Sequence, residues 1–334
     1  MMWISIVAFV LSFMGIFFLK KYASQLKLIA IPNERSLHQK MTPQGGGAII
    51  AIIFLAFTLF LNIFGYMNNV EFLALFGGGL IMTITGFLDD IWNINASIRF
   101  FIQFLAAGWG LYWIGGIPSI PLLNYVDGLY ALANAVVVVA LVWFINSFNF
   151  MDGIDGLATS GAIFFSLSLS GYCFWQGIEP YGILLIVLSA ASLAFLCFNW
   201  PPAKMFLGDA GSNFFGYLFG ILLLITVKNN NLSVWTWLIV LAYFITDTTT
   251  TTLLRIYMVK GWYRTHRSHA YQNLARVLNN HKFVTCLILG INIFYLLPLA
   301  YLSILYPQYA WIVFLAGDFP ILIFVLKFGP LYAK

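Results

Sequence analysis

The sequence predicts an all-α polytopic integral membrane protein, and three observations support this fold class. Of the 334 residues, 62% are hydrophobic and 8% are charged, whereas ordinary soluble domains are about 45–50% apolar and about 25% charged. The 16 basic and 11 acidic side chains are too few to cover a water-soluble chain of this length, and disorder requires low hydrophobicity and high charge. The apolar residues form continuous runs, which favour helices over the alternating strands of a barrel.

The apolar runs are long enough for about eleven transmembrane helices, since a helix crosses the hydrocarbon layer in about 20 residues. We expect the spans at 2–19, 47–65, 71–88, 98–115, 129–147, 157–175, 181–198, 212–228, 234–254, 283–303 and 308–327. The first run has no basic residues before it and lysines after it, so we expect a retained span and not a cleaved signal peptide. The three cysteines lie within apolar runs, which excludes a disulfide framework.

Basic residues concentrate on the cytoplasmic side of membrane proteins. With eleven spans, every basic residue except Lys228 falls on one side of the membrane. We therefore place the N-terminus outside and the C-terminus in the cytoplasm. Residues 1–334 form a single transmembrane domain, and we expect one active site built from its cytoplasmic loops. These loops are 20–46, 89–97, 148–156, 199–211 and 255–282.

The first cytoplasmic loop, IPNERSLHQKMTPQGGGAII, combines cationic side chains with three glycines directly before a span. Backbone N–H groups at a helix N-terminus bind phosphate, and Arg35, His38 and Lys40 supply further donors. The alternative is a loop that needs turns, with basic residues that only set the topology.

The second loop contains an acidic pair, Asp89 and Asp90, in GFLDDIWNINASIRF. Adjacent helical side chains point in different directions, so we expect the two acids to have different partners. Their predicted task is to handle a cation or a proton. A capping acid would explain one of them but explains both poorly.

The third loop, NSFNFMDGIDGLATS, repeats polar residues every third position, including Asn149, Asp152 and Asp155. Such a mixture of donors and acceptors suits a uridine or a metal ion. The alternative is a polar turn with capping acids.

The fourth loop, FNWPPAKMFLGDAGSNFFG, places Asp209 between two glycines before a span. Such a carboxylate can reach Mg²⁺, a hard ion that takes few carboxylates and shares phosphate oxygens. Phe206 can stack on a base and Asn199 can bind a polar part of a ligand, although an aromatic residue at a membrane surface also serves as an anchor.

The fifth loop is rich in cations and contains His266, Arg267 and His269. The two histidines resemble a metal pair, but the surrounding cations favour a phosphate or diphosphate. The alternative is a basic loop that sets topology and attracts anionic lipid.

Taken together, the carboxylates and cations of the five loops form one predicted cytoplasmic layer, which suits Mg²⁺ and phosphoryl transfer between anions. The membrane setting suggests a lipid substrate.

The motifs IPNERSLHQKMTPQGGG, GFLDD, NSFNFMDGIDGLA and FLGDAGS, in this order over roughly residues 30–275, closely resemble the polyprenyl-phosphate N-acetylhexosamine-1-phosphate transferases of glycosyltransferase family 4. This family includes the enzymes that start O-antigen and common-antigen synthesis and the phospho-MurNAc-pentapeptide transferase. The resemblance implies that undecaprenyl phosphate attacks a UDP-N-acetyl sugar, with Mg²⁺ or Mn²⁺ required. UMP leaves, and a lipid-linked diphosphate sugar forms.

The resemblance also implies a setting and partners. It places the protein in a bacterial inner membrane, with the active site on the cytoplasmic face and membrane lipids around it. No nucleic-acid partner is expected, and a homodimer is implied because family members are often dimers.

By motif position, the resemblance implies that Asp209 is the Mg²⁺ ligand. It implies that Asp89 and Asp90 lie near the lipid phosphate, and Asp155 and His269 complete the predicted catalytic residues. The predicted substrate-binding residues are Lys40, Asn149, Asp152, Asn199, Phe206, His266 and Arg267. Direct attack and an aspartyl intermediate both remain open.

The fifth loop departs from the family, which often has a run of histidines there. In this chain His269 is followed by Ala270, Tyr271 and Gln272. The departure argues against the peptidoglycan enzyme and favours the O-antigen or common-antigen branch.

Three other classes compete with this interpretation. A transporter of an anionic or lipid-linked solute predicts ionisable residues near the midplane, and Asp318 alone lies clearly within a run. A CDP-alcohol phosphotransferase also has an Asp-x-x-Asp-Gly element, but it needs Ala-Arg where this chain has Leu157-Ala158-Thr159. A non-catalytic scaffold gives no reason for five polar clusters on one face.

Overall fold

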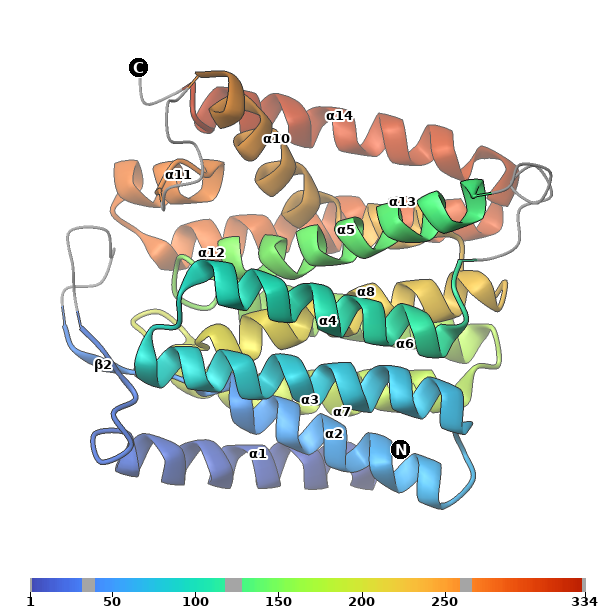
Figure 1. Ribbon diagram of the computed structural model, residues 1–334. Helices are drawn as coiled ribbons and strands as arrows, with labels where there is room; N and C mark the ends of the chain where they lie inside the picture. The colour runs from blue at the N-terminus through green and yellow to red at the C-terminus, as the bar shows by residue number, and fades with distance from the viewer. Residues whose placement is uncertain (1, 32–39, 118–127, 259–265, 332–334) are drawn as a thin grey trace.

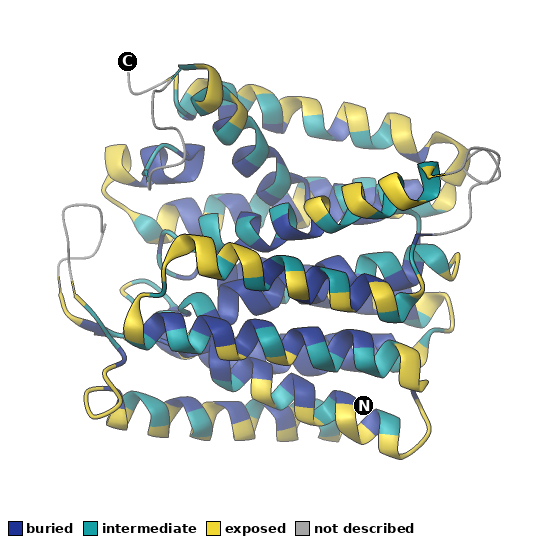
Figure 2. Cartoon of the chain, in the orientation of Figure 1, coloured by how far each residue is buried: buried dark blue, intermediate teal, exposed yellow. Residues whose placement is uncertain are grey.

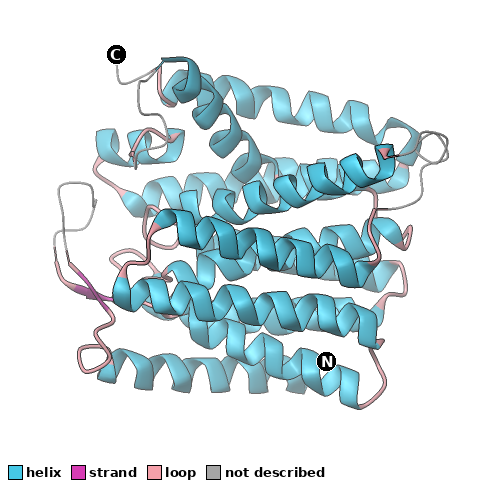
Figure 3. Cartoon of the chain, viewed as in Figure 1, coloured by secondary structure: helices cyan, strands magenta, loops and turns pink. Residues whose placement is uncertain are grey.

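The computed structural model describes residues 2–31, 40–117, 128–258 and 266–331, and these residues are mostly helical (Figure 3). The helices are α1 (Met2–Tyr22), α2 (Gly47–Ile63), α3 (Asn69–Trp92), α4 (Ala96–Ile114), α5 (Leu129–Phe150), α6 (Leu157–Trp175), α7 (Glu179–Asn199), α8 (Asp209–Lys228), α9 (Val234–Val240), α10 (Ala242–Met258), α11 (Ala270–Leu278), α12 (His281–Ile291), α13 (Leu297–Leu305) and α14 (Ala310–Phe328). Most long helices run side by side, and α10 crosses them steeply (Figure 1).

The predicted all-α membrane architecture is confirmed at the level of helices. Each predicted span coincides, within a few residues, with one helix or with two joined helices. Eight helical segments of the described chain are long and apolar enough to cross a membrane, or up to nine if the bent pair α9 and α10 counts as one span. The helices α2 and α4 are not among them. The count of eleven and the orientation therefore stay predictions.

Helix α8 lies at the centre of the bundle, and most of its side chains are buried (Figure 2). It packs against α3 and α5 and also contacts α2 and α4. Its aromatic residues join rings from α5, α6 and α10, with Phe148 stacked on Phe219 at 5.4 Å between ring centroids. The helix that begins at Asp209 is thus fixed from several sides.

Several segments are not simple straight spans. The axes of α9 and α10 differ by 79° across Leu241. The π-helix η2 (Asn292–Leu296) interrupts the span between α12 and α13, and the short helix η3 (Pro307–Tyr309) precedes α14. Helix α11 has nine residues, too few to cross a membrane, and its first six residues are buried.

The loop between α1 and α2 returns to the bundle through a small hairpin. Strand β1 (Ile29–Ala30) pairs antiparallel with β2 (Thr42–Pro43). The N–H groups of Gly46 and Gly47 then donate to the carbonyls of Phe206 and Leu207 at 3.2 and 2.9 Å. These two N–H groups are therefore already paired and do not bind the phosphate that the glycine run was expected to hold.

Lys228, the one basic residue predicted outside, is held by the protein. Its Nζ donates to the carbonyls of Ile114 and Gly115, at 2.6 and 2.8 Å. A cation at the C-terminal end of a helix interacts favourably with the helix dipole. Lys228 therefore ties the end of α8 to the end of α4.

Candidate active site

The centre of the candidate site is an arginine between two carboxylates. Arg99 lies in the first turn of α4, and its Nη1 donates to Oδ2 of Asp89 at 2.5 Å and to Oδ2 of Asp209 at 2.6 Å. Asp89 also accepts the backbone N–H of Ile94, at 2.6 Å. Because a charged donor lies between the two acids, their mutual repulsion is reduced. The end of α3 and the start of α8 are thereby joined.

Asp90 caps helix α8 from the neighbouring helix α3. Its Oδ1 accepts the N–H of Asp209 at 2.9 Å, and its Oδ2 accepts the N–H of Ala210 at 3.3 Å. A carboxylate at a helix N-terminus satisfies orphan donors and favours the helix dipole. Gly208 has a φ of +77°, and a Cβ there would lie 2.4 Å from the Asp90 carboxylate. The predicted difference in partners between Asp89 and Asp90 is confirmed.

Asn149 holds the other side of Asp209. Its Nδ2 donates to Oδ1 of Asp209 at 2.9 Å and to Oγ of Ser212 at 3.1 Å. Each Asp209 oxygen thus accepts one hydrogen bond, which fixes the carboxylate plane and leaves lone pairs for a further ligand. Residues from α3, α4, α5 and α8 therefore meet at one carboxylate.

Asp152 is the acid of the site that has no hydrogen-bond partner for its carboxylate among the described residues. It is half-buried in the turn between α5 and α6, and it accepts no hydrogen bond from the part of the chain that the structure describes. Burial raises the pKa of Asp152 well above its ordinary value, and the nearby carboxylates of Asp209, Asp90 and Asp155 raise it further. A cation near this carboxylate would relieve that repulsion.

The donor set fits Mg²⁺ better than a closed structural metal site. Within the described ranges, no three His, Cys, Asp or Glu side chains are grouped closely enough to hold a metal ion by themselves. Mg²⁺ usually binds through one or two carboxylates, waters and substrate phosphates. Asp209 and the unpartnered Asp152, which interact electrostatically, match that requirement.

His269 lies in a buried pair beside this site. Its Nδ1 is 3.2 Å from Oδ1 of Asp247, and Asp247 also accepts the N–H groups of Ala270 and Tyr271 at 3.1 and 3.3 Å. Asp247 therefore caps α11 and orients His269 at the same time. The Tyr271 hydroxyl donates to the carbonyl of Phe150 at 2.6 Å, which attaches α11 to the turn that carries Asp152.

His266 stacks on His269 with 5.1 Å between the ring centroids. The pKa of His266 is lowered from 6.5 to about 3, mainly by burial and also by the neighbouring His269 and Arg255. His266 is therefore neutral at pH 7 and can act as a hydrogen-bond donor or acceptor, but not as a cation.

Asp155 and Asn199 are engaged within the protein. Oδ2 of Asp155 accepts the N–H of Ala203 at 3.1 Å and lies 3.5 Å from Nδ1 of His281. The Asn199 amide accepts from the Gly156 N–H at 3.1 Å and donates to the Met205 carbonyl at 3.0 Å. Both residues fix the loop that leads to Asp209. Their predicted roles in catalysis and substrate binding stay predictions.

The remaining predicted residues lie around this centre. Lys40 is exposed next to β2, and the Phe206 N–H donates to the Pro43 carbonyl at 2.8 Å, so the first and fourth loops adjoin. Arg267 is half-buried in the segment before α11. Arg35 and His38 lie outside the described residues, and the ligand contacts of the whole set stay predictions.

Arg99 is the functional candidate that sequence reasoning missed. From the sequence alone, Arg99 is one of the basic residues that predict the topology. The available signal was its place in GFLDDIWNINASIRF, ten residues after Asp89 and across one tight turn. Asp209, its second partner, is 110 residues away in sequence, so no local pattern indicates that contact.

Comparisons with known proteins identify the family of this chain. The model of a family described as glycosyl transferase family 4 matches residues 72–227. A probable undecaprenyl-phosphate N-acetylglucosaminyl 1-phosphate transferase of Bacillus subtilis is 29% identical over 287 residues, which cover 83% of this chain and 79% of the relative.

Two further relatives have related names. A decaprenyl-phosphate N-acetylglucosaminephosphotransferase of Mycobacterium tuberculosis is 31% identical over 221 residues, or 59% of this chain and 53% of the relative. A phospho-N-acetylmuramoyl-pentapeptide-transferase of Streptococcus pyogenes is 30% identical over 235 residues, or 63% of this chain and 69% of the relative. The chain therefore belongs to glycosyl transferase family 4, together with these polyprenyl-phosphate sugar-phosphate transferases and the phospho-N-acetylmuramoyl-pentapeptide-transferase.

Proposed function

We propose that this protein transfers an N-acetylhexosamine 1-phosphate from a UDP-sugar to undecaprenyl phosphate. An oxygen of the lipid phosphate forms a bond to the sugar-bearing phosphorus, and the bond from that phosphorus to the oxygen shared with UMP breaks. UMP leaves with that oxygen, and the product is a lipid-linked diphosphate sugar. The names of the relatives support the general reaction.

The observation that carries the proposal is the meeting of Asp209, Arg99 and Asp152 at one end of the bundle. Both reactants are anions, so the reaction needs positive charge and fixed acceptors around the phosphates. Arg99 supplies a cation between two acids. Asp209 and Asp152 would hold Mg²⁺, which when bound neutralises charge on the transferring phosphate.

The surrounding residues have positioning roles in this proposal. Asp90 fixes the backbone at the start of α8, and Asn149 fixes the carboxylate of Asp209. Asp89 holds Arg99 from the other side. Charges that are held in place before the reaction stabilise the transition state better than charges that must reorient. The hydrogen bonds of Asp90, Asn149 and Asp89 therefore contribute to catalysis by fixing Asp209 and Arg99.

The sugar and the pathway belong to the same proposal. Two of the reported relatives carry N-acetylglucosamine in their names, so UDP-N-acetylglucosamine is the first donor to test. We propose that the product starts a cell-surface polysaccharide of the O-antigen type, made on the cytoplasmic face of a bacterial inner membrane.

The test is UMP release by purified protein in detergent, with undecaprenyl phosphate, Mg²⁺ and a panel of UDP-N-acetyl sugars. We expect release that requires both the lipid and Mg²⁺ and stops with EDTA. Asp209→Asn should reduce it more than 100-fold, in the range usual for loss of a catalytic electrostatic group. Asp318→Asn is the matched control, since Asp318 bonds Thr246 outside the site, and it should keep activity within about twofold of wild type. Lipid-independent or EDTA-resistant release would contradict the proposal.

A further inference from the structure

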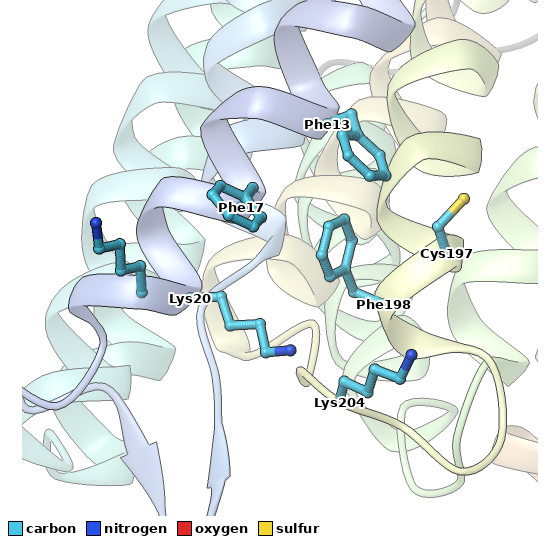
Figure 4. Close-up of a pocket in the computed structure, with 7 residues that line it drawn as sticks. Phe13, Phe17, Lys20, Cys197, Phe198 and Lys204 are labelled. Atoms are coloured by element: carbon cyan, nitrogen blue, oxygen red, sulfur yellow. The ribbon is translucent and has the colours of Figure 1, made fainter.

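A groove lined by aromatic and basic side chains opens between α1 and α7, outside the carboxylate site. Its volume is about 500 Å³, and it is lined by Phe13, Phe17, Lys20, Lys21, Cys197, Phe198 and Lys204 (Figure 4). Phe13 and Phe198 face each other with 5.0 Å between ring centroids. The lining therefore divides into an apolar part along the helices and a basic part at their ends.

The basic part has no acidic partner among the described residues. Lys20 Nζ lies 5.8 Å from the centre of the Phe198 ring, and Lys204 extends from the loop after α7 on the other side of Phe198 (Figure 4). None of Lys20, Lys21 and Lys204 pairs with an acid among the residues that the structure describes. The Lys21 ammonium lies over the Tyr22 ring, 5.5 Å from its centroid. The two ammonium groups of Lys20 and Lys204 beside one apolar groove favour a ligand with an anionic head and an apolar tail.

We propose that this groove binds one anionic phospholipid. The lipid phosphate would lie between Lys20 and Lys204, with Lys21 nearby, and an acyl chain would lie against Phe13, Phe17 and Phe198. Phe13 and Phe17 are 37% and 52% exposed in the protein alone, so an acyl chain would cover apolar surface on α1. The charges select an anionic head over a zwitterionic one.

The bound lipid would also hold the loop that leads to the carboxylate site. The N–H groups of Lys204 and Met205 both donate to the Phe198 carbonyl, at 2.7 and 3.2 Å. This loop then contacts the first loop through Phe206 and ends at Asp209. Lipid binding at Lys204 should therefore raise the thermal stability of the protein, whatever reaction the site performs.

The experiment measures phosphatidylglycerol binding by native mass spectrometry and the melting temperature in detergent, with phosphatidylcholine of the same chains as the comparison. We expect phosphatidylglycerol to bind more tightly and to raise the melting temperature more. The double variant Lys20→Gln/Lys204→Gln should weaken phosphatidylglycerol binding by about thirtyfold, because each lysine near an anionic lipid contributes to affinity.

Two double variants serve as controls. Lys282→Gln/Lys327→Gln removes the same charge from α12 and α14 and should bind phosphatidylglycerol as the wild type does. Lys20→Arg/Lys204→Arg keeps the charge and should also retain binding. Because Lys20 and Lys204 form no ion pair with a described residue and surface lysines contribute little to stability, all variants should melt near the wild type without lipid.

Four outcomes would overturn the proposal. The first is equal binding of the two phospholipids, and the second is equal loss in the control pair on α12 and α14. The third is displacement of phosphatidylglycerol by millimolar inorganic phosphate, which would indicate a free-anion site. The fourth is binding of undecaprenyl phosphate alone at the groove, which would assign it to the acceptor substrate.

Discussion

The aspartates of the candidate site fall into two groups, according to whether their carboxylates accept hydrogen bonds from the described residues. Asp90 accepts two backbone N–H groups, and Asp209 accepts side-chain donors on both oxygens. Asp152 accepts none from the described residues, although it lies near both acids. A held carboxylate contributes to the fold, whereas an unpartnered one among other acids destabilises it and remains available to a ligand.

Asp152→Asn should therefore separate activity from stability. Because the pKa of Asp152 is raised in the folded protein, its ionisation destabilises the fold increasingly as the pH rises above the ordinary carboxyl value. In EDTA at pH 7, the variant should melt at or above the wild-type temperature, and the difference should shrink as the pH falls toward 4. UMP release should fall more than 100-fold. A variant that melts lower than wild type at every pH would show that Asp152 is structural.

Asp90→Asn, unlike Asp152→Asn, should lower the stability of the protein. The amide keeps one acceptor and turns a donor toward the N–H groups at the start of α8, so one capping bond is lost. We expect the free energy of unfolding to fall by about 1–3 kcal/mol, measured by thermal denaturation in detergent. An unchanged melting temperature would mean that the cap is not needed.

At the scale of elements, the close approach of α3 to α8 positions the site. Gly86 of α3 faces the start of α8, where a Cβ would lie 2.3 Å from the carbonyl oxygen of Asp209. That distance is shorter than any real Cβ contact and the neighbour is backbone, so the two helices would have to separate. The distance between Asp89 and Asp209, and thus the reach of Arg99, depends on this glycine.

Gly86→Ala should lower both stability and UMP release. We expect a loss of about 1–3 kcal/mol in the free energy of unfolding, as for overpacking elsewhere. Gly108→Ala in α4 is the matched control, because nothing lies within 4 Å of a Cβ there, and it should be neutral or slightly stabilising. Equal melting temperatures for the two variants would contradict the proposed role of the close approach.

The sequence predicted where the helices lie far better than how they bend and meet. Continuous apolar runs locate spans directly, and every predicted span has its helix. The bend at Leu241 and the capping of α8 by Asp90 depend on contacts between distant segments, which no local pattern encodes. The acidic residues of the site could be predicted because ionisable groups are rare in membrane helices. The contacts of Arg99 with Asp89 and Asp209, and of Asp247 with His269, could not be predicted from the sequence.

For the whole molecule, the main prediction is its orientation in the membrane. The distribution of basic residues predicts a cytoplasmic side, and the site loops are predicted on that same side. Lys228 does not weaken this assignment, because backbone carbonyls hold it at the end of α4.

Thiol labelling in a cysteine-free background tests this orientation. Asn229→Cys and Lys282→Cys both replace exposed residues, on opposite predicted sides. We expect a membrane-impermeant reagent to label Asn229→Cys in intact cells and Lys282→Cys only after permeabilisation. The reverse pattern would place the carboxylate site outside the cytoplasm and exclude the proposed donor.

The central claim is that the sugar moves together with its phosphate. The most direct measurement uses a UDP-N-acetyl sugar labelled at the sugar-bearing phosphate, with undecaprenyl phosphate, Mg²⁺ and the purified protein. The account predicts that the label appears in the lipid extract, with unlabelled UMP released in equal amount. Label that stays with the released nucleotide as UDP would show transfer of the sugar alone and would contradict the account.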